Sequence, residues 1–224
     1  MKVEQVLIPL GDEKSVSGVL TIPEGYTGKQ AVIFAHGAGN DMHQPMLVFL
    51  AERMAQAGYL TLRFNFLYKE QGKNTPDKQD VLCRTWDAAC ELLRSHPHYR
   101  PERIIAAGKS MGGRIASQMA AEGKLPVERL IFLGYPLHPS GRKDVLRDQH
   151  LYEIKIPLLF FAGTKDQLCD LELLKGVLSH LATPWQLEII EGGDHSFNVP
   201  KAAGINAETI FERILGKILE WLNE

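Results

Sequence analysis

Short apolar runs rich in β-branched and aromatic residues recur along the chain and alternate with longer amphipathic stretches. Continuous apolar runs of this length are typical of strands that are buried on both faces of a parallel sheet. Turn-forming residues bound the runs, as expected for strand ends. The predicted strands are residues 16–22, 30–35, 59–64, 103–107, 129–133, 157–162 and 185–190.

The stretches between these runs carry apolar residues at helical spacing. In the first of them, 45–57, Pro45 lies at the start and Gly58 just past the end, which is the usual punctuation of a helix. Strands that alternate with helices predict an α/β fold, in which helices cover both faces of a mostly parallel central sheet. We find no repeat or linker, so one domain spanning residues 1–224 is expected. The other predicted helices contain 82–93, 111–121, 170–181 and 207–222.

Composition narrows the class of protein. The chain has 25 Lys and Arg against 27 Asp and Glu, with 45% hydrophobic and 23% charged residues. This balance argues against a nucleic-acid partner, because such proteins carry a basic excess. The three cysteines, Cys83, Cys90 and Cys169, form no C-x-x-C pair, and residues 1–10 do not resemble a signal peptide. No apolar run reaches the length of a membrane span. We expect a cytoplasmic protein without a membrane partner.

Candidate chemistry follows the strand ends, because parallel sheets bind ligands at the carboxyl ends of their strands. The strand 103–107 is followed by GKSMG, a G-x-S-x-G pattern in which Ser110 stands between strand and helix. A serine on such a strained turn exposes its hydroxyl, and Gly108 and Gly112 leave room for the neighbouring backbone. A phosphate-binding P-loop would need glycine where Arg103 stands. An ordinary helix-capping role for Ser110 remains an alternative.

A glycine-rich turn, HGAGN, follows the strand 30–35. Acyl-transfer enzymes need two amides aimed at the developing oxyanion, one from the residue after the nucleophile and one from the loop after this earlier strand. Met111 would supply the first amide. Ala38 is the expected second donor, and Gly37 is the alternative.

The last two strand ends carry a carboxylate and an imidazole. GTKD places Asp166 after the strand 157–162, and GGDHSF places His195 after the strand 185–190. A histidine base must be held in one tautomer by a carboxylate and must reach the serine hydroxyl. The order Ser110, Asp166, His195 therefore predicts a triad. Two other acids are rivals for the carboxylate role, but Asp170 is better placed to cap a helix and Asp194 to hold its own loop.

The segments AHGAG, RFNF, GKSMGGR, GYPLHPSG, GTKD and GGDHSF together resemble the α/β-hydrolase superfamily, in its dienelactone-hydrolase-like branch. More closely, they resemble the family of predicted hydrolases that includes the testis-expressed hydrolase-like proteins and the hydrolase-like subunit of the NSL histone acetyltransferase complex. The likeness covers residues 32–199. It implies Ser110 as nucleophile, Asp166 as acid and His195 as base. Dienelactone hydrolases proper use a cysteine nucleophile, so dienelactone itself is not the expected substrate.

The expected function is that of a carboxylesterase-like serine hydrolase that needs no cofactor and no metal. It would cleave a small ester or thioester through an acyl-enzyme, with a small acyl compound as its partner and a monomer or homodimer as its assembly. The remaining histidines lack metal-ligand spacing. The alternative is a protein-interaction module that keeps the fold without the catalysis.

The pocket is expected to be shallow, because the segment 137–156 is too short for a cap domain and has room only for a loop and one or two helical turns. Several positive charges near the rim, on Lys109, Arg142, Lys143 and Arg147, are typical of a solvated basic face, and a small or anionic acyl substrate is the alternative that they suggest. The expected substrate contacts are His36, Gly37, Lys109, Leu137 and His138.

Overall fold

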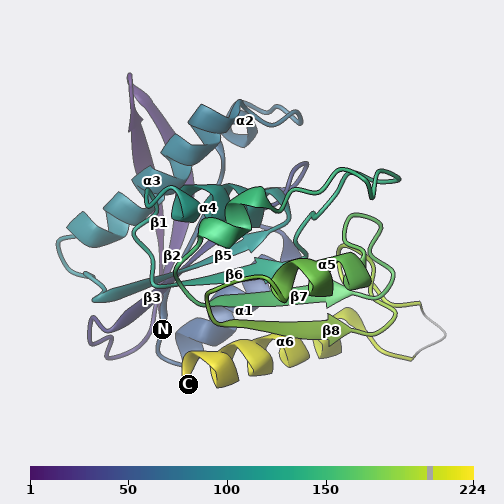
Figure 1. Ribbon diagram of the computed structural model, residues 1–224. Coiled ribbons are helices and arrows are strands. Elements are labelled where there is room, and N and C mark those ends of the chain that lie inside the picture. The colour runs from purple at the N-terminus through teal and green to yellow at the C-terminus, as the bar shows by residue number, and fades with distance from the viewer. Residues whose placement is uncertain (201–203) are drawn as a thin grey trace.

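A single eight-stranded sheet forms the centre of the protein, and the computed structural model describes residues 1–200 and 204–224. The strand order is β1-β2-β4-β3-β5-β6-β7-β8 (Figure 1). β2 runs antiparallel to both of its neighbours, whereas the strands from β4 to β8 are parallel. The strands are β1 (Lys2–Gly11), β2 (Lys14–Ile22), β3 (Gln30–Ala35), β4 (Leu60–Phe64), β5 (Arg103–Lys109), β6 (Arg129–Leu133), β7 (Leu158–Gly163) and β8 (Trp185–Ile190).

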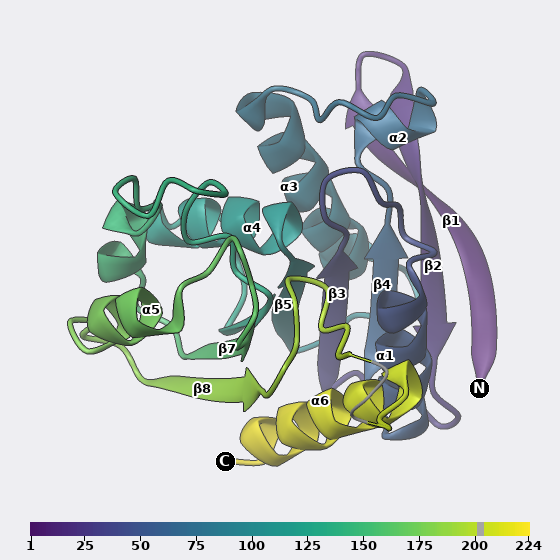
Figure 2. The ribbon, with the colours of Figure 1, turned by 90° about the vertical axis from the view of Figure 1, so that its right-hand side faces the viewer.

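Helices cover both faces of the sheet (Figure 2). On one face, α1 (Pro45–Gln56) and α6 (Ala207–Leu222) pack over a cluster that includes Phe34 and Trp221. On the other, α3 (Gln79–Ser95), α4 (Met111–Ala121) and α5 (Leu171–Leu178) pack over a cluster that includes Trp86 and Phe132. The predicted α/β class is thereby confirmed, because strands that are apolar on both faces need a helical layer on each side.

Most predicted elements are confirmed, and several have the predicted bounds. β1 and the short helix α2 (Leu67–Glu70) were not predicted. β1 is an edge strand whose Val3 and Leu7 stay exposed, so its apolar pattern does not show the usual alternation. Asp12 and Glu13, both with positive φ, form the tight turn that returns the chain into β2.

After β3 the chain crosses to β4, which pairs with β3 on one side, while β5 pairs with β3 on the other side. In the pairing of β3 with β5, Ala35 lies opposite Gly108. This reversal opens a crevice outside the carboxyl ends of β3 and β5. The turns after these two strands begin at His36 and Ser110, respectively. The topology therefore brings the HGAGN turn and the G-x-S-x-G turn to the same point.

The segment between β6 and β7 contains one short helix, η1 (Gln149–Glu153), and otherwise irregular chain. The expected loop with one or two helical turns is therefore confirmed, and the segment contains no helical cap domain. Within residues 1–200 and 204–224, no helix combines the length and the apolar character needed to cross a membrane. The same residues contain no cluster of His, Cys, Asp and Glu side chains that could hold a metal ion.

Candidate active site

Ser110 occupies a strained turn between β5 and α4. Its φ of 49° and ψ of −112° are rarely adopted by a residue with a side chain, and such strain persists only where the surroundings enforce it. Two glycines allow the neighbouring backbone to pack closely enough to hold Ser110 in this strained conformation. A Cβ on Gly108 would lie 2.2 Å from the Gly113 nitrogen, and one on Gly112 would lie 2.7 Å from the Ala35 oxygen. The backbone is thus packed tightly enough to hold the serine hydroxyl in one place.

A continuous hydrogen-bond relay joins Ser110 to His195 and Asp166. The distance from His195 Nε2 to Ser110 Oγ is 2.8 Å, and that from His195 Nδ1 to Asp166 Oδ2 is also 2.8 Å. An ionised carboxylate can only accept a hydrogen bond, so Nδ1–H is the donor to Asp166. Nε2 is then left with a lone pair that accepts the Ser110 hydroxyl. This is the tautomer that a general base requires.

Asp166 lies in the loop after β7, and its side chain has no solvent exposure, whereas that of His195 is 22% exposed. Burying a carboxylate is costly unless its oxygens are hydrogen-bonded. Here Oδ1 accepts from the Leu168 amide at 2.7 Å while Oδ2 faces the imidazole. The carboxylate is consequently fixed in orientation, and it fixes the ring.

The two rival acids have other partners. Asp170 Oδ1 caps α5 by accepting from the amides of Glu172 and Leu173. Asp194 Oδ1 accepts from the amides of Ser196 and Asn198 at 2.7 and 2.9 Å. The helix-capping and loop-holding interpretations of these residues are therefore confirmed.

Ala38 and Met111, the expected oxyanion donors, lie beside Ser110. Both residues line the same cavity as the serine. Met111 is the first residue of α4, and the first amides of a helix have no partner within it. Neither amide donates to a protein acceptor in the part of the chain that the structure describes. Gly37 is absent from the cavity wall and packs against the Ser110 Cβ, so the geometry favours Ala38 over Gly37 as the second donor.

The cavity beside Ser110 has a volume of about 470 Å³. Two arginines, Arg114 and Arg147, belong to its wall. Arg114 donates a hydrogen bond to Gln118 and Arg147 to the Pro136 oxygen, and no ion pair with a carboxylate is found for either among the described residues. Burial lowers the pKa of Arg114, and the charge of Arg147 lowers it further. Two cationic residues against one acidic residue, Asp77, in the wall favour an anion in this cavity. The remaining lining residues are Pro76, Asp77, Gln79, Leu82, Ile115, Pro136, Pro139, Ser140 and Leu168.

Arg114 was not among the residues singled out from the sequence. It follows Ser110 by one helical turn, which places both residues on the same side of α4. That spacing, within the segment GKSMGGR, was the signal that could have identified it.

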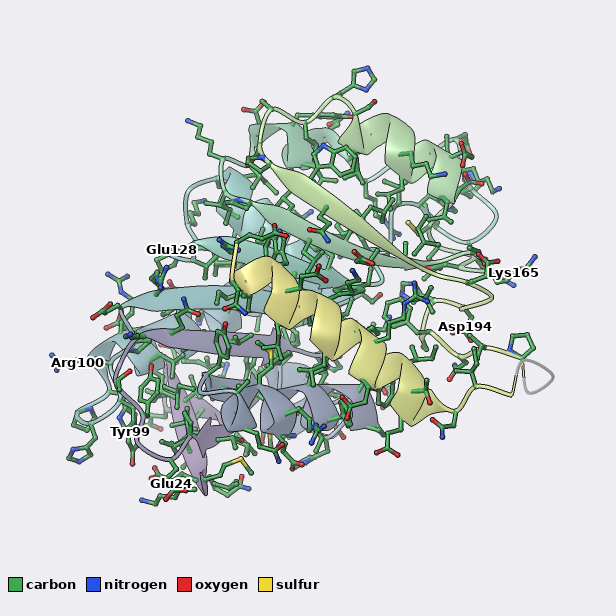
Figure 3. All side chains as sticks on the ribbon, turned by 90° about the horizontal axis from the view of Figure 1, so that it is seen from below. Glu24, Tyr99, Arg100, Glu128, Lys165 and Asp194 are labelled. Carbon is green, nitrogen blue, oxygen red and sulfur yellow. The ribbon has the colours of Figure 1, made fainter. Side chains whose placement is uncertain are left out.

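A second cavity, of about 330 Å³, is lined by His195 and by Lys165 and Asp194 beside it. It shares Ser140 and Leu168 with the first cavity. Figure 3 shows Lys165 and Asp194 at one end of the sheet, far from Tyr99, Arg100 and Glu128 at the other. Both cavities thus open at the carboxyl ends of the strands.

His36 and His138, two of the expected substrate contacts, lie off the walls of both cavities, and their side chains are buried and hydrogen-bonded to the backbone. His36 Nε2 accepts from the Phe66 amide at 3.1 Å, and its Nδ1 donates to the Gly37 oxygen at 2.8 Å. Burial lowers the pKa of His36 to about 4, which keeps this ring neutral. His138 Nε2 accepts from the Asp170 amide at 3.0 Å. Both histidines therefore shape loops around the site.

Lys109, Leu137 and Gly37, the other expected substrate contacts, also lie off the walls of both cavities. All three residues are buried, and Lys109 is only 2% exposed. The turns after the strands therefore place these residues in the interior beside the site.

Of the four cations expected near the rim, Arg147 alone belongs to the cavity wall. Arg142 pairs with Asp144 and Lys143 with Asp170 in exposed loops. Their charges are therefore largely compensated and screened by solvent.

Comparison with known proteins shows what this chain is similar to. The sequence model of the family described as "Alpha/beta hydrolase domain" matches residues 28–223. A protein provisionally named phosphoribosyl transferase, from Mycobacterium tuberculosis, is 29% identical over 202 residues. The match covers 86% of this chain and 43% of that protein. The chain thus spans less than half the length of this relative.

Similar solved structures include a dienelactone hydrolase from Anabaena variabilis, at 27% identity, 98% coverage of this chain, 96% of that chain and a TM-score of 0.76. A serine hydrolase without lid from Xanthomonas campestris matches at 20% identity and a TM-score of 0.67, over 88% of this chain and 87% of that one. Est1E from Butyrivibrio proteoclasticus, with ferulic acid bound, matches at 16% identity and a TM-score of 0.77. This match covers 98% of this chain and 100% of that one. The last two likenesses show the fold alone.

Proposed function

We propose, from the fact that this chain belongs to the alpha/beta hydrolase domain family, that it is a serine hydrolase which cleaves a small ester or thioester. The observation that carries this proposal is the relay from the Ser110 hydroxyl through His195 to Asp166, with 2.8 Å at each step. A nucleophile, a base in hydrogen-bond reach and a group that orients the base are the parts that acyl transfer requires.

The reaction would proceed in two steps. Ser110 Oγ attacks the carbonyl carbon while His195 Nε2 takes the hydroxyl proton, and Asp166 stabilises the imidazolium. The amides of Met111 and Ala38 donate to the oxyanion. As the tetrahedral intermediate collapses, His195 returns the proton to the departing oxygen or sulfur, which leaves an acyl group on Ser110. Water, deprotonated by His195, then releases the acid and restores the serine.

The two adjoining cavities support a division between acyl group and leaving group. The larger one contains the nucleophile and the expected oxyanion donors, and the smaller one is bordered by His195, the residue that would protonate the leaving group. The volume of the larger cavity, about 470 Å³, accommodates a compact acyl group.

A fluorophosphonate probe tests the function directly. We expect one phosphonyl group per folded chain, attached to Ser110, because the relay makes this hydroxyl nucleophilic. Intact-mass and peptide mass spectrometry measure the adduct and its position. Ser110→Ala should take up none, while Ser179→Ala, at the surface end of α5, should label like the wild type. Folded wild-type protein that stays unlabelled would favour the non-catalytic interaction module.

Short acyl groups should be the preferred substrates. In a series of nitrophenyl esters from acetate to dodecanoate, kcat/KM should peak at the short end, because the segment between β6 and β7 adds no helical cap that would give long acyl chains an apolar surface. No jump in rate is expected where the ester begins to aggregate. A steady rise of kcat/KM toward long chains, or such a jump, would contradict the prediction.

A second arm of this series tests the charge of the cavity. Nitrophenyl hemisuccinate should have a lower KM than nitrophenyl butyrate, because its carboxylate can bind Arg114 and Arg147. Arg114→Met or Arg147→Met should raise the KM of the hemisuccinate by about 10-fold or more, the value of a charged hydrogen bond, and leave that of the butyrate unchanged. Arg142→Met, outside the cavity and paired with Asp144, is the control. Equal losses for both esters would mean that the arginines only support the fold.

A further inference from the structure

Lys109 precedes the nucleophile in the sequence and is almost completely buried. A buried ammonium group is costly unless it is hydrogen-bonded, so its partner identifies its role. Nζ donates to the backbone oxygen of His195 at 2.7 Å. It also lies 5.8 Å from the centre of the Phe197 ring. Both partners belong to the loop after β8, which carries the candidate base.

Gly134, the residue after β6, leaves space for this contact. A Cβ on Gly134 would lie 3.0 Å from Lys109 Nζ and 2.9 Å from the His195 oxygen, and Gly134 has a φ of 74°. A side chain there would therefore push the lysine and the histidine loop apart. The end of β5, the end of β6 and the loop after β8 meet at this one point.

We propose that Lys109 is a positioning residue, whose ammonium group holds the backbone of His195 and so keeps the imidazole between Ser110 and Asp166. This inference rests on the proposed serine hydrolase function. Hydrogen bonds at Nδ1 and Nε2 orient the ring, but they do not fix the backbone from which it extends. Lys109 supplies that third attachment, from the strand that carries the nucleophile.

The charge of the lysine strengthens this attachment. A hydrogen bond from an ammonium group is stronger than one from a neutral amine. Burial lowers the pKa of Lys109 to about 8, although the carboxylates of Asp166 and Asp194 oppose the shift. These two acids are the ionisable groups that act on Lys109, and the His195 backbone oxygen accepts its hydrogen bond. The lysine is therefore charged below about pH 8 and loses its proton above it, so the hold on His195 weakens as pH rises.

Lys109→Met tests the proposal because it keeps the bulk and removes the donor. We expect kcat for a short ester to fall about 10-fold or more, since small displacements of a catalytic group are costly, and KM to stay within about two-fold. The rate of fluorophosphonate labelling should fall by the same factor. Lys109→Gln, a shorter neutral donor, should recover part of the loss. Lys143→Met, at the surface, is the matched control.

Two further measurements separate positioning from general stability. The low-field proton resonance of His195 Nδ1–H should be sharp in the wild type and broadened in Lys109→Met at an unchanged melting temperature. Wild-type kcat should decline as pH rises through about 8, whereas Lys109→Met should stay flat across that interval. If the variants fail to fold, the wild-type profile and resonance still decide, and both should change together near pH 8.

The outcomes distinguish this proposal from the function on which it rests. Wild-type protein that takes up no fluorophosphonate overturns the proposed function. A labelled wild type with undiminished kcat in Lys109→Met, or with a loss confined to KM, overturns only the role of Lys109. A wild-type resonance and kcat that do not change near pH 8 would likewise overturn it.

Discussion

Ser110→Ala is expected to lower kcat on a short ester by as much as about 10⁶-fold, and His195→Ala by a similar factor. The serine hydroxyl becomes a strong nucleophile only when Nε2 of His195 takes its proton, over the observed 2.8 Å. Among the residues that the structure describes, the imidazole has its hydrogen-bond partners in Ser110 and Asp166. Removing either residue therefore also removes the catalytic contribution of the other.

The double variant is the sharper measurement. Because the two side chains act as one unit, Ser110→Ala with His195→Ala should be hardly slower than either single variant. Steady-state rates on nitrophenyl acetate, corrected for hydrolysis by water, give all three values. Each variant should keep the wild-type melting temperature. Additive losses in the double variant would show that the two residues do not share a mechanism.

Asp166→Asn is expected to lower kcat by about 10⁴-fold. An amide at this position can offer N–H to Nδ1, which would stabilise the opposite tautomer and place the proton on Nε2. His195 could then no longer accept the proton of Ser110. The fully buried setting of Asp166 strengthens the expectation, since no water can substitute for the lost carboxylate oxygen.

Asp194→Asn supplies the matched comparison, one residue from the base. Its carboxylate holds the loop through backbone amides and makes no hydrogen bond to the imidazole, and asparagine retains an oxygen that can accept those bonds. Its cost should be far smaller and should appear as a lower melting temperature. If Asp194→Asn were the more damaging change at an unchanged melting temperature, Asp166 would not be the acid.

Periodicity was sufficient to predict the α/β class. The local pattern of apolar and polar residues shows whether a segment buries one face or both. It predicted β3, β6 and β8 and the helices α4 and α6 with the bounds that the structure has. β1 was missed because its place depends on a partner. It lies at the edge of the sheet, keeps apolar Leu7 exposed, and becomes a strand by pairing with β2.

The sequence also indicated which strand ends carry Ser110, Asp166 and His195, since in a parallel sheet all carboxyl ends meet at one edge. It could not decide which neighbouring side chains face the cavity. His138 and Lys109 are directed inward, where backbone groups distant in the sequence satisfy them, while Arg114 and Arg147 meet from separate elements. The local sequence pattern determines the secondary structure. The strand order then limits where a site can form. The direction of a side chain in a turn depends on the space and the hydrogen-bond partners that remote segments supply, and these exist only once the chain has folded.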